Sequence, residues 1–182
     1  MKKEVRTAKT QFDVTGAENP VLEGYALKFN TDSVNLGSFV ETLSRDCLAN
    51  ADMSNVVALI NHDSNLPLGR TGVNLELNVD DVGLKFRVTP TNTSYAKDLM
   101  ENIKKGVVNQ CSFAFTLADA EGADEWQEQE DGLYKRTIHK IGKLYDVSIV
   151  TSPAYEDTNV SVGQRSLEAV QRKKLSLFME TL

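Results

Sequence analysis

The segment Leu133–Val150, LYKRTIHKIGKLYDVSIV, is the part of the sequence on which the fold prediction depends most. It is rich in β-branched and aromatic residues, so we expect one long strand, or two strands that break near Gly142. Asp146 is a charged residue inside an otherwise apolar part of this run. Burial of an unpaired carboxylate is unfavourable, so Asp146 should have a partner. A histidine, a structural arginine or a backbone amide would each satisfy it.

Most of the remaining chain also predicts strands. Val56–Ile60 (VVALI) is a short continuous apolar run, which is typical of a strand buried on both faces. Residues 75–79 and 84–88 both alternate apolar and polar side chains, and the turn-forming residues 80–83 between them indicate a β-hairpin. Further strands are predicted at residues 4–14, 21–30 (with a possible bulge at Gly24), 38–43 and 107–117.

Helices are predicted at a few places only. Residues 94–105 form an amphipathic pattern that ends at Gly106, a suitable residue for the end of a helix, and residues 47–51 predict a short helical turn. The acidic stretch 119–132 predicts an exposed loop. Residues 166–182 predict a C-terminal amphipathic helix that follows a linker near residues 161–165. The fold class expected is therefore α+β and mostly β, with a closed or near-closed sheet and short helices.

Composition narrows the functional classes. The chain has 182 residues and a formal charge of −6, which argues against a nucleic-acid-binding protein. It contains no run of about 18 apolar residues, so no membrane span is expected, and the basic N-terminus lacks the apolar segment of a secretory signal. Cys47 and Cys111 are isolated and fit no metal-binding spacing, so we expect buried thiols, no metal site and no cofactor.

The search for a general base is short because the chain has only two histidines, His62 and His139. His62 follows the apolar strand 56–60 and precedes turn-forming residues, a position that is held rigidly by a sheet and faces an opening. Ser112 lies in NQCSFAF, where Phe113 and Phe115 should share one face of a strand and Ser112 the other. A serine becomes a nucleophile only when a base takes its proton. From pattern alone, a surface histidine in a turn and a structural serine in a strand are the favoured interpretations.

Four segments in order resemble the prohead (capsid maturation) serine proteases of tailed bacteriophages. They are GYALKFN (24–30), ALINHDSNLPLGRT (58–71), GVVNQCSFAF (106–115) and LYDVSIVTSPAYEDTNV (144–160). Each motif alone is weak, and their order and spacing carry the resemblance, which spans roughly residues 22–162. It implies a β-barrel ringed by short helices, related to the herpesvirus assemblin proteases. It also implies a protease domain over residues 1–162 and a helical tail over residues 163–182.

The resemblance also implies the roles of individual residues. His62 and Ser112 fall on the positions of the catalytic pair. Asp146 is favoured as the third member, while the herpesvirus relatives use a second histidine, a part that His139 could play. Arg70 is considered as a contributor to oxyanion stabilisation beside backbone amides.

The expected function is that of a serine endopeptidase that cleaves itself and the scaffold segment of the major capsid protein, or a separate scaffolding protein, inside the assembling prohead in the host cytoplasm. No nucleic acid or membrane partner is expected, and a homo-oligomer is. The alternative is a catalytically inactive capsid-assembly protein of the same fold.

Overall fold

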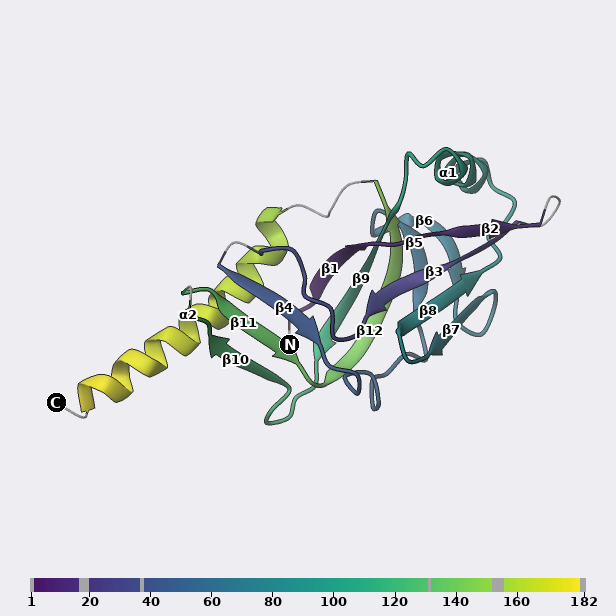
Figure 1. Cartoon of the computed structure of the whole chain (residues 1–182). Coiled ribbons are helices and arrows are strands. Elements are labelled where there is room, and N and C mark those ends of the chain that lie inside the picture. The colour runs from purple at the N-terminus through teal and green to yellow at the C-terminus, as the bar shows by residue number, and fades with distance from the viewer. Residues whose placement is uncertain (1, 17–19, 37, 131, 152–155, 181–182) are drawn as a thin grey trace.

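The computed structural model describes residues 2–16, 20–36, 38–130, 132–151 and 156–180, and these form three sheets and two helices (Figure 1). The five-stranded sheet has the order β1 (Glu4–Lys9), β9 (Gln110–Leu117), β12 (Ile141–Val150), β5 (Val57–Ile60) and β6 (Asp63–Arg70). The four-stranded sheet has the order β2 (Asp13–Thr15), β3 (Val21–Lys28), β8 (Gly83–Val88) and β7 (Leu75–Val79). The three-stranded sheet has the order β10 (Asp124–Glu128), β11 (Tyr134–Ile138) and β4 (Phe39–Leu43).

The five-stranded sheet lies in the middle of the molecule (Figure 1). The four-stranded sheet and α1 (Ser94–Lys104) lie toward one end, and the three-stranded sheet and α2 (Glu156–Glu180) lie toward the other. The main apolar core joins the two larger sheets and buries Ala96, Leu99, Met100 and Ile103 of α1. Burial of that helical face stabilises α1, because its N-cap residue makes no side-chain cap bond and only its C-terminal end, at Gly106, is capped by backbone hydrogen bonds.

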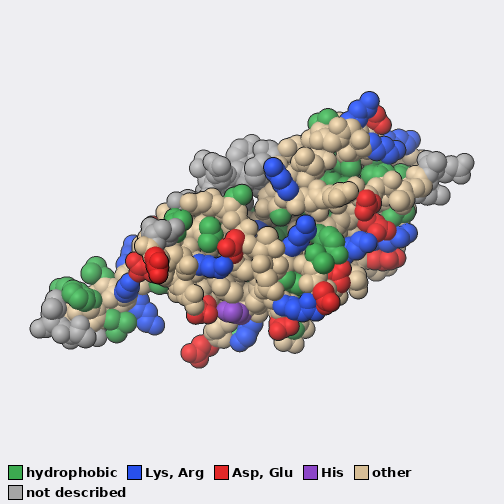
Figure 2. Space-filling view, viewed as in Figure 1, with side chains coloured by type: hydrophobic (Ala, Val, Ile, Leu, Met, Phe, Trp, Pro, Cys, Tyr) green, Lys and Arg blue, Asp and Glu red, His purple; other side chains and the backbone are tan. Residues whose placement is uncertain are grey.

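A second, smaller apolar cluster holds α2 against the three-stranded sheet. Leu167 of α2 is buried with Phe39 of β4 and Tyr134 of β11. The side chains of residues 171–179 are exposed, although Lys174 bonds to Glu128 of β10, and hydrophobic side chains are visible at the outer end of the helix (Figure 2). No helix in the described ranges combines the length and apolarity needed to cross a bilayer.

A buried charge cluster connects the three-stranded sheet to β1 of the central sheet. It consists of Glu4 and Arg6 from β1, Glu41 from β4 and Arg136 from β11, all at most 7% exposed. Arg6 forms two 2.7 Å hydrogen bonds to Glu41, and Arg136 lies 2.6 Å from Glu4 and 2.9 Å from Glu41. The two arginines and two glutamates are shielded from water, and their opposite charges compensate one another.

The expected closed barrel is not confirmed. In the described residues the strands form three separate hydrogen-bonded sheets, because β4 pairs in parallel with β11 and does not extend the five-stranded sheet. The mostly-β, α+β class is confirmed. Instead of a ring of short helices, the described residues contain α1 and the long helix α2.

Several local predictions need correction. The break in the segment 133–150 falls at His139 and Lys140, and the irregularity in β3 lies between Tyr25 and Leu27 rather than at Gly24. The acidic stretch contains the strand β10, whose backbone pairs with β11 while Glu125 and Glu128 face solvent. Residues 47–51 form turns instead of a helix, and the linker expected near 161–165 is helical, since α2 begins at Glu156. The proposed division at residue 162 stays a prediction.

Replacement of Arg136 by Met should destabilise the fold strongly. Removal of one member leaves Glu4 and Glu41 buried with reduced compensation, so we expect the free energy of unfolding to fall by about 3 kcal/mol or more. The matched control is Arg87→Met, which removes an arginine whose side chain is 51% exposed and paired with Glu23, and which should cost less than about 1 kcal/mol. Urea unfolding followed by circular dichroism measures both. Equal losses in the two variants would contradict the importance of the cluster.

Candidate active site

The register of β12 places the polar residues of the site on one face of the central sheet. Ser148 of β12 lies opposite Ser112 of β9, and Asp146 lies opposite Ala114. Opposite residues in an antiparallel pair project from the same face. The alternate residues Phe113 and Phe115 stack on each other in the main core, as the sequence pattern predicted. The sheet thus separates an apolar face from the face that carries Ser112.

The structure brings together the three residues predicted for the site. Nε2 of His62 lies 2.6 Å from Oγ of Ser112, and Nδ1 of His62 lies 2.6 Å from Oδ1 of Asp146. The Ser112 side chain is buried, with 0% of the residue exposed, whereas the His62 side chain is 17% exposed. Residues from β9, from the β5–β6 turn and from β12 therefore form one continuous hydrogen-bonded chain.

A tight turn holds His62 in reach of both partners. β5 ends at Ile60 and β6 begins opposite it at Asp63, so Asn61 and His62 form a two-residue hairpin loop. Their φ angles are 50° and 57°. Positive φ at both central positions characterises the type I′ turn, which matches the twist of a hairpin. Asn61 also donates its backbone N–H to the carbonyl of Ile149, 3.0 Å away, which ties the turn to β12.

The hydrogen bonds determine the tautomer of His62. Burial opposes ionisation of Asp146, but the hydrogen bonds and charges of His62 and Lys3 outweigh it and hold the pKa of this carboxyl below its ordinary value. An ionised carboxylate only accepts hydrogen bonds, so Nδ1 of His62 must donate to Asp146. In the neutral ring, Nε2 is then free to accept the hydroxyl proton of Ser112. This is the arrangement that a general base requires.

Three polar contacts of the site were not predicted from the sequence. Oγ of Ser148 donates to Asp146 Oδ1 over 2.9 Å, and Lys3 Nζ lies 2.9 Å from Asp146 Oδ2. The hydroxyl of Ser112 has a second acceptor within reach, the backbone carbonyl of Arg6 at 2.9 Å, to which it can donate its one proton instead of donating to His62. Only Ser148 carried a local signal, because residues two apart on a strand share a face. Lys3 and Arg6 are more than 100 positions from their partners and gave none.

The structure does not bring His139 or Arg70 to this site. His139 follows β11 at the surface, 3.4 Å from the Glu125 carboxylate. Arg70 is the last residue of β6, and its side chain donates a hydrogen bond to the side chain of the exposed Asn55. Among the described residues, no hydrogen bond joins Arg70 to Ser112, His62 or Asp146. The second-histidine alternative and the proposed oxyanion contribution of Arg70 therefore have no geometric support.

Comparison with known proteins identifies a family and a similar solved structure. The model of the caudovirus prohead serine protease family matches residues 4–173. The chain belongs to this family. The fold is similar to that of the bacteriophage T4 capsid assembly protease gp21, with a TM-score of 0.51 and 13% sequence identity over 84% of this chain and 98% of that one. No protein with a curated description gave a match.

The two cysteines of this prohead protease, Cys47 and Cys111, are unsuitable as nucleophiles. Burial raises the pKa of Cys111, the neighbour of Ser112, to about 12, and that of Cys47 to about 12 as well. Both thiols therefore stay protonated and unreactive at neutral pH. Among the described residues, no group of three or more histidine, cysteine, aspartate or glutamate side chains could hold a metal ion.

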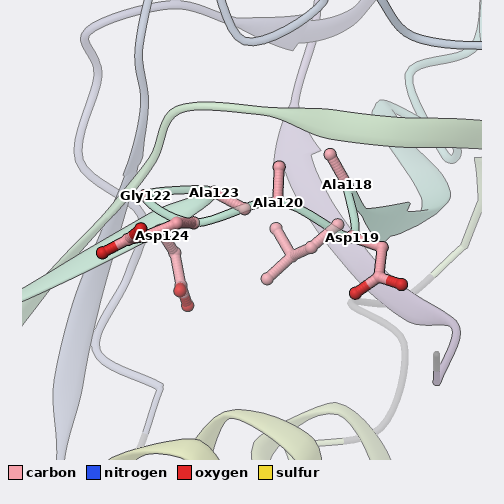
Figure 3. A pocket seen from close by; sticks show the side chains of 8 residues that line it. Ala118, Asp119, Ala120, Gly122, Ala123 and Asp124 are labelled. Carbon is pink, nitrogen blue, oxygen red and sulfur yellow. The ribbon is translucent and has the colours of Figure 1, made fainter.

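The candidate site is distinct from a surface pocket elsewhere in the fold. That pocket lies in the loop after β9 and is lined by Leu117 to Asp124, which are mostly small residues together with Asp119, Glu121 and Asp124 (Figure 3). It includes neither Ser112 nor His62. Its lining carries three carboxylates and no basic side chain.

The turn that carries His62 can be tested at Asn61. Asn61→Val and Asn61→Gly both lose the bond that the side chain accepts from the Thr151 amide. Only valine is strained at positive φ, so Asn61→Val should be less stable than Asn61→Gly by about 1–2 kcal/mol. Thermal and urea unfolding of the two variants give this difference. Equal stability would contradict the left-handed turn.

Proposed function

We propose that this chain is a serine endopeptidase in which Ser112 is the nucleophile, His62 the general base and Asp146 the residue that orients His62. The observation that carries the proposal is the chain of 2.6 Å contacts from Ser112 through His62 to Asp146. Membership of the prohead serine protease family supports the same reaction class. The alignment of a hydroxyl, an imidazole and a carboxylate in this order is the arrangement by which unrelated proteases activate serine.

The reaction follows from the positions of the protons. His62 Nε2 takes the proton of Ser112 as Oγ attacks the substrate carbonyl carbon, and the tetrahedral intermediate carries the negative charge on its oxygen. The imidazolium formed at His62 is stabilised by the Asp146 carboxylate. It then protonates the departing amine, which leaves an acyl-enzyme at Ser112. Water, deprotonated by His62, hydrolyses the acyl-enzyme and restores the free serine.

The substrates we propose are the scaffold segment of the major capsid protein, or a separate scaffolding protein, and this chain itself. The family supports capsid proteins as substrates and the assembling prohead in the host cell as the place of action. Because Ser112 is 0% exposed, a substrate carbonyl can reach Oγ only after the groups that cover it move. Such a closed site fits a protease that becomes active only within an assembly.

Ser112→Ala tests the nucleophile. Co-expression of this variant with the capsid protein of the same phage should leave the scaffold segment uncleaved, with a loss of about 10⁴-fold or more in the cleavage rate. Mass spectrometry of the capsid protein and of this chain measures both scaffold cleavage and self-cleavage. The control is Ser148→Ala, which removes a neighbouring hydroxyl and should retain measurable activity. Cleavage by Ser112→Ala at the wild-type rate would overturn the assignment.

Asp146→Asn and His139→Ala test the third residue. Asp146→Asn removes the acceptor that holds the Nδ1–H tautomer of His62, so activity should fall by about 10³-fold or more. The ring of His139 lies near the surface carboxylate of Glu125 and is not bonded to Ser112, His62 or Asp146 in the described residues, so His139→Ala should stay within about twofold of the wild type. Initial rates of scaffold cleavage give the comparison. A large loss in His139→Ala alone would reverse the choice.

A further inference from the structure

Lys3 makes a charged contact with Asp146 that the triad mechanism does not use. Its ammonium lies 2.9 Å from Oδ2 of Asp146, while His62 binds the other oxygen, Oδ1. The Asp146 side chain is 4% exposed and that of Lys3 is 48% exposed. The ammonium also lies 5.4 Å from the centre of the Tyr145 ring. One carboxylate therefore shares its charge between a permanent cation and the imidazole.

The fold holds Lys3 at this place. The next residue, Glu4, is buried and bonded to Arg6 and Arg136 in the buried charge cluster. Pairing of β1 with β9 fixes the following residues, with Thr7 opposite Ser112. The backbone on which Lys3 sits is therefore anchored within one residue of its Cα, which keeps the base of its side chain within reach of Asp146.

We propose that Lys3 is a positioning residue that sets the pH range in which His62 can act as a base. The inference rests on the proposed function, because it assigns Lys3 a part in the same reaction. A positive charge beside Asp146 reduces the attraction between this carboxylate and a protonated His62. Lys3 thus favours the neutral imidazole, which is the form that accepts the proton of Ser112.

The other groups around Asp146 and His62 do not supply this charge. On β9 they are Ser112 and the neutral thiol of Cys111, and on β12 the hydroxyl of Ser148. Beside His62, the Asp63 carboxylate accepts from Asn65. The side chain of Arg6 is bonded to Glu4 and Glu41 within the buried charge cluster. In the described part of the chain, Lys3 is the only cationic side chain other than His62 that is bonded to Asp146.

A proton NMR titration of the full chain tests the proposal without a substrate. The chain has two histidines, and His139→Ala assigns their ring signals. Lys3→Met removes the charge but keeps an unbranched side chain, so the titration midpoint of His62 should rise by about half a unit to one unit. The midpoint of His139, at the surface beside Glu125, should stay unchanged as an internal reference.

Two further variants separate charge from other effects of substitution. Lys3→Arg keeps the charge and should restore the wild-type midpoint. Lys2→Met removes the neighbouring exposed lysine and should leave the midpoint within about 0.2 units. In the cleavage assay, Lys3→Met should move the acidic limb of kcat/KM to higher pH by the same amount, with KM unchanged. A purely structural role for Lys3 would lower activity without moving this limb.

The outcomes distinguish this inference from the proposed function. If the His62 midpoint does not move in Lys3→Met, or moves equally in Lys2→Met, the role of Lys3 is wrong whatever the chain cleaves. If the midpoint moves but Ser112→Ala cleaves as the wild type does, the electrostatic coupling stands, and both the nucleophile assignment and the catalytic meaning of Lys3 fail. If the midpoint and the acidic limb move together, both proposals are supported.

Discussion

The position of β12 between β9 and β5 is the constraint on which the site depends. β12 runs antiparallel to β9 and parallel to β5, so its register is fixed by hydrogen bonds on both sides. With this register, Asp146 and Ser148 share a face with Ser112. A shift by one residue would turn Asp146 into the apolar core and bring Val147 to the site. The core side chains of β12 on the opposite face, Val147 and Ile149, oppose such a shift because it would remove them from the apolar core.

The same arrangement explains how charged groups are tolerated inside a small β-rich protein. Asp146 is buried, but three donors from three parts of the chain bind it: His62, Ser148 and Lys3. The buried charge cluster at the other side of β1 follows the same rule, with two arginines matched to two glutamates. Here burial raises and the arginines lower the pKa of Glu4, and the net result is a pKa below the ordinary value. β1 therefore links the two sets of charges: Glu4 and Arg6 belong to the buried charge cluster, and Lys3, the residue before Glu4, binds Asp146.

Local patterns predicted a large part of the secondary structure. The hairpin of β7 and β8, the helix α1 and the strands around Ser112 follow from alternation, turn residues and a helix-ending glycine that act over a few positions. The errors arise where pairing partners decide. β10 lies in a stretch with an acidic, loop-like composition, and it is a strand because β11 satisfies its backbone. The prediction of a closed barrel was not confirmed for a similar reason, because the sequence of β4 does not specify that its partner is β11.

The sequence by itself determined the candidate pair His62 and Ser112 and left Asp146 and His139 as alternatives for the third residue, because the order of four short motifs resembles that of a known family. It also determined the mostly-β class, since side-chain alternation has a period that only a strand satisfies. Only the tertiary structure decided between Asp146 and His139 as the partner of His62, and only it revealed Lys3 and the carbonyl of Arg6. Those contacts join residues more than 80 positions apart, and their distances depend on strand order and register. No local pattern encodes these two properties.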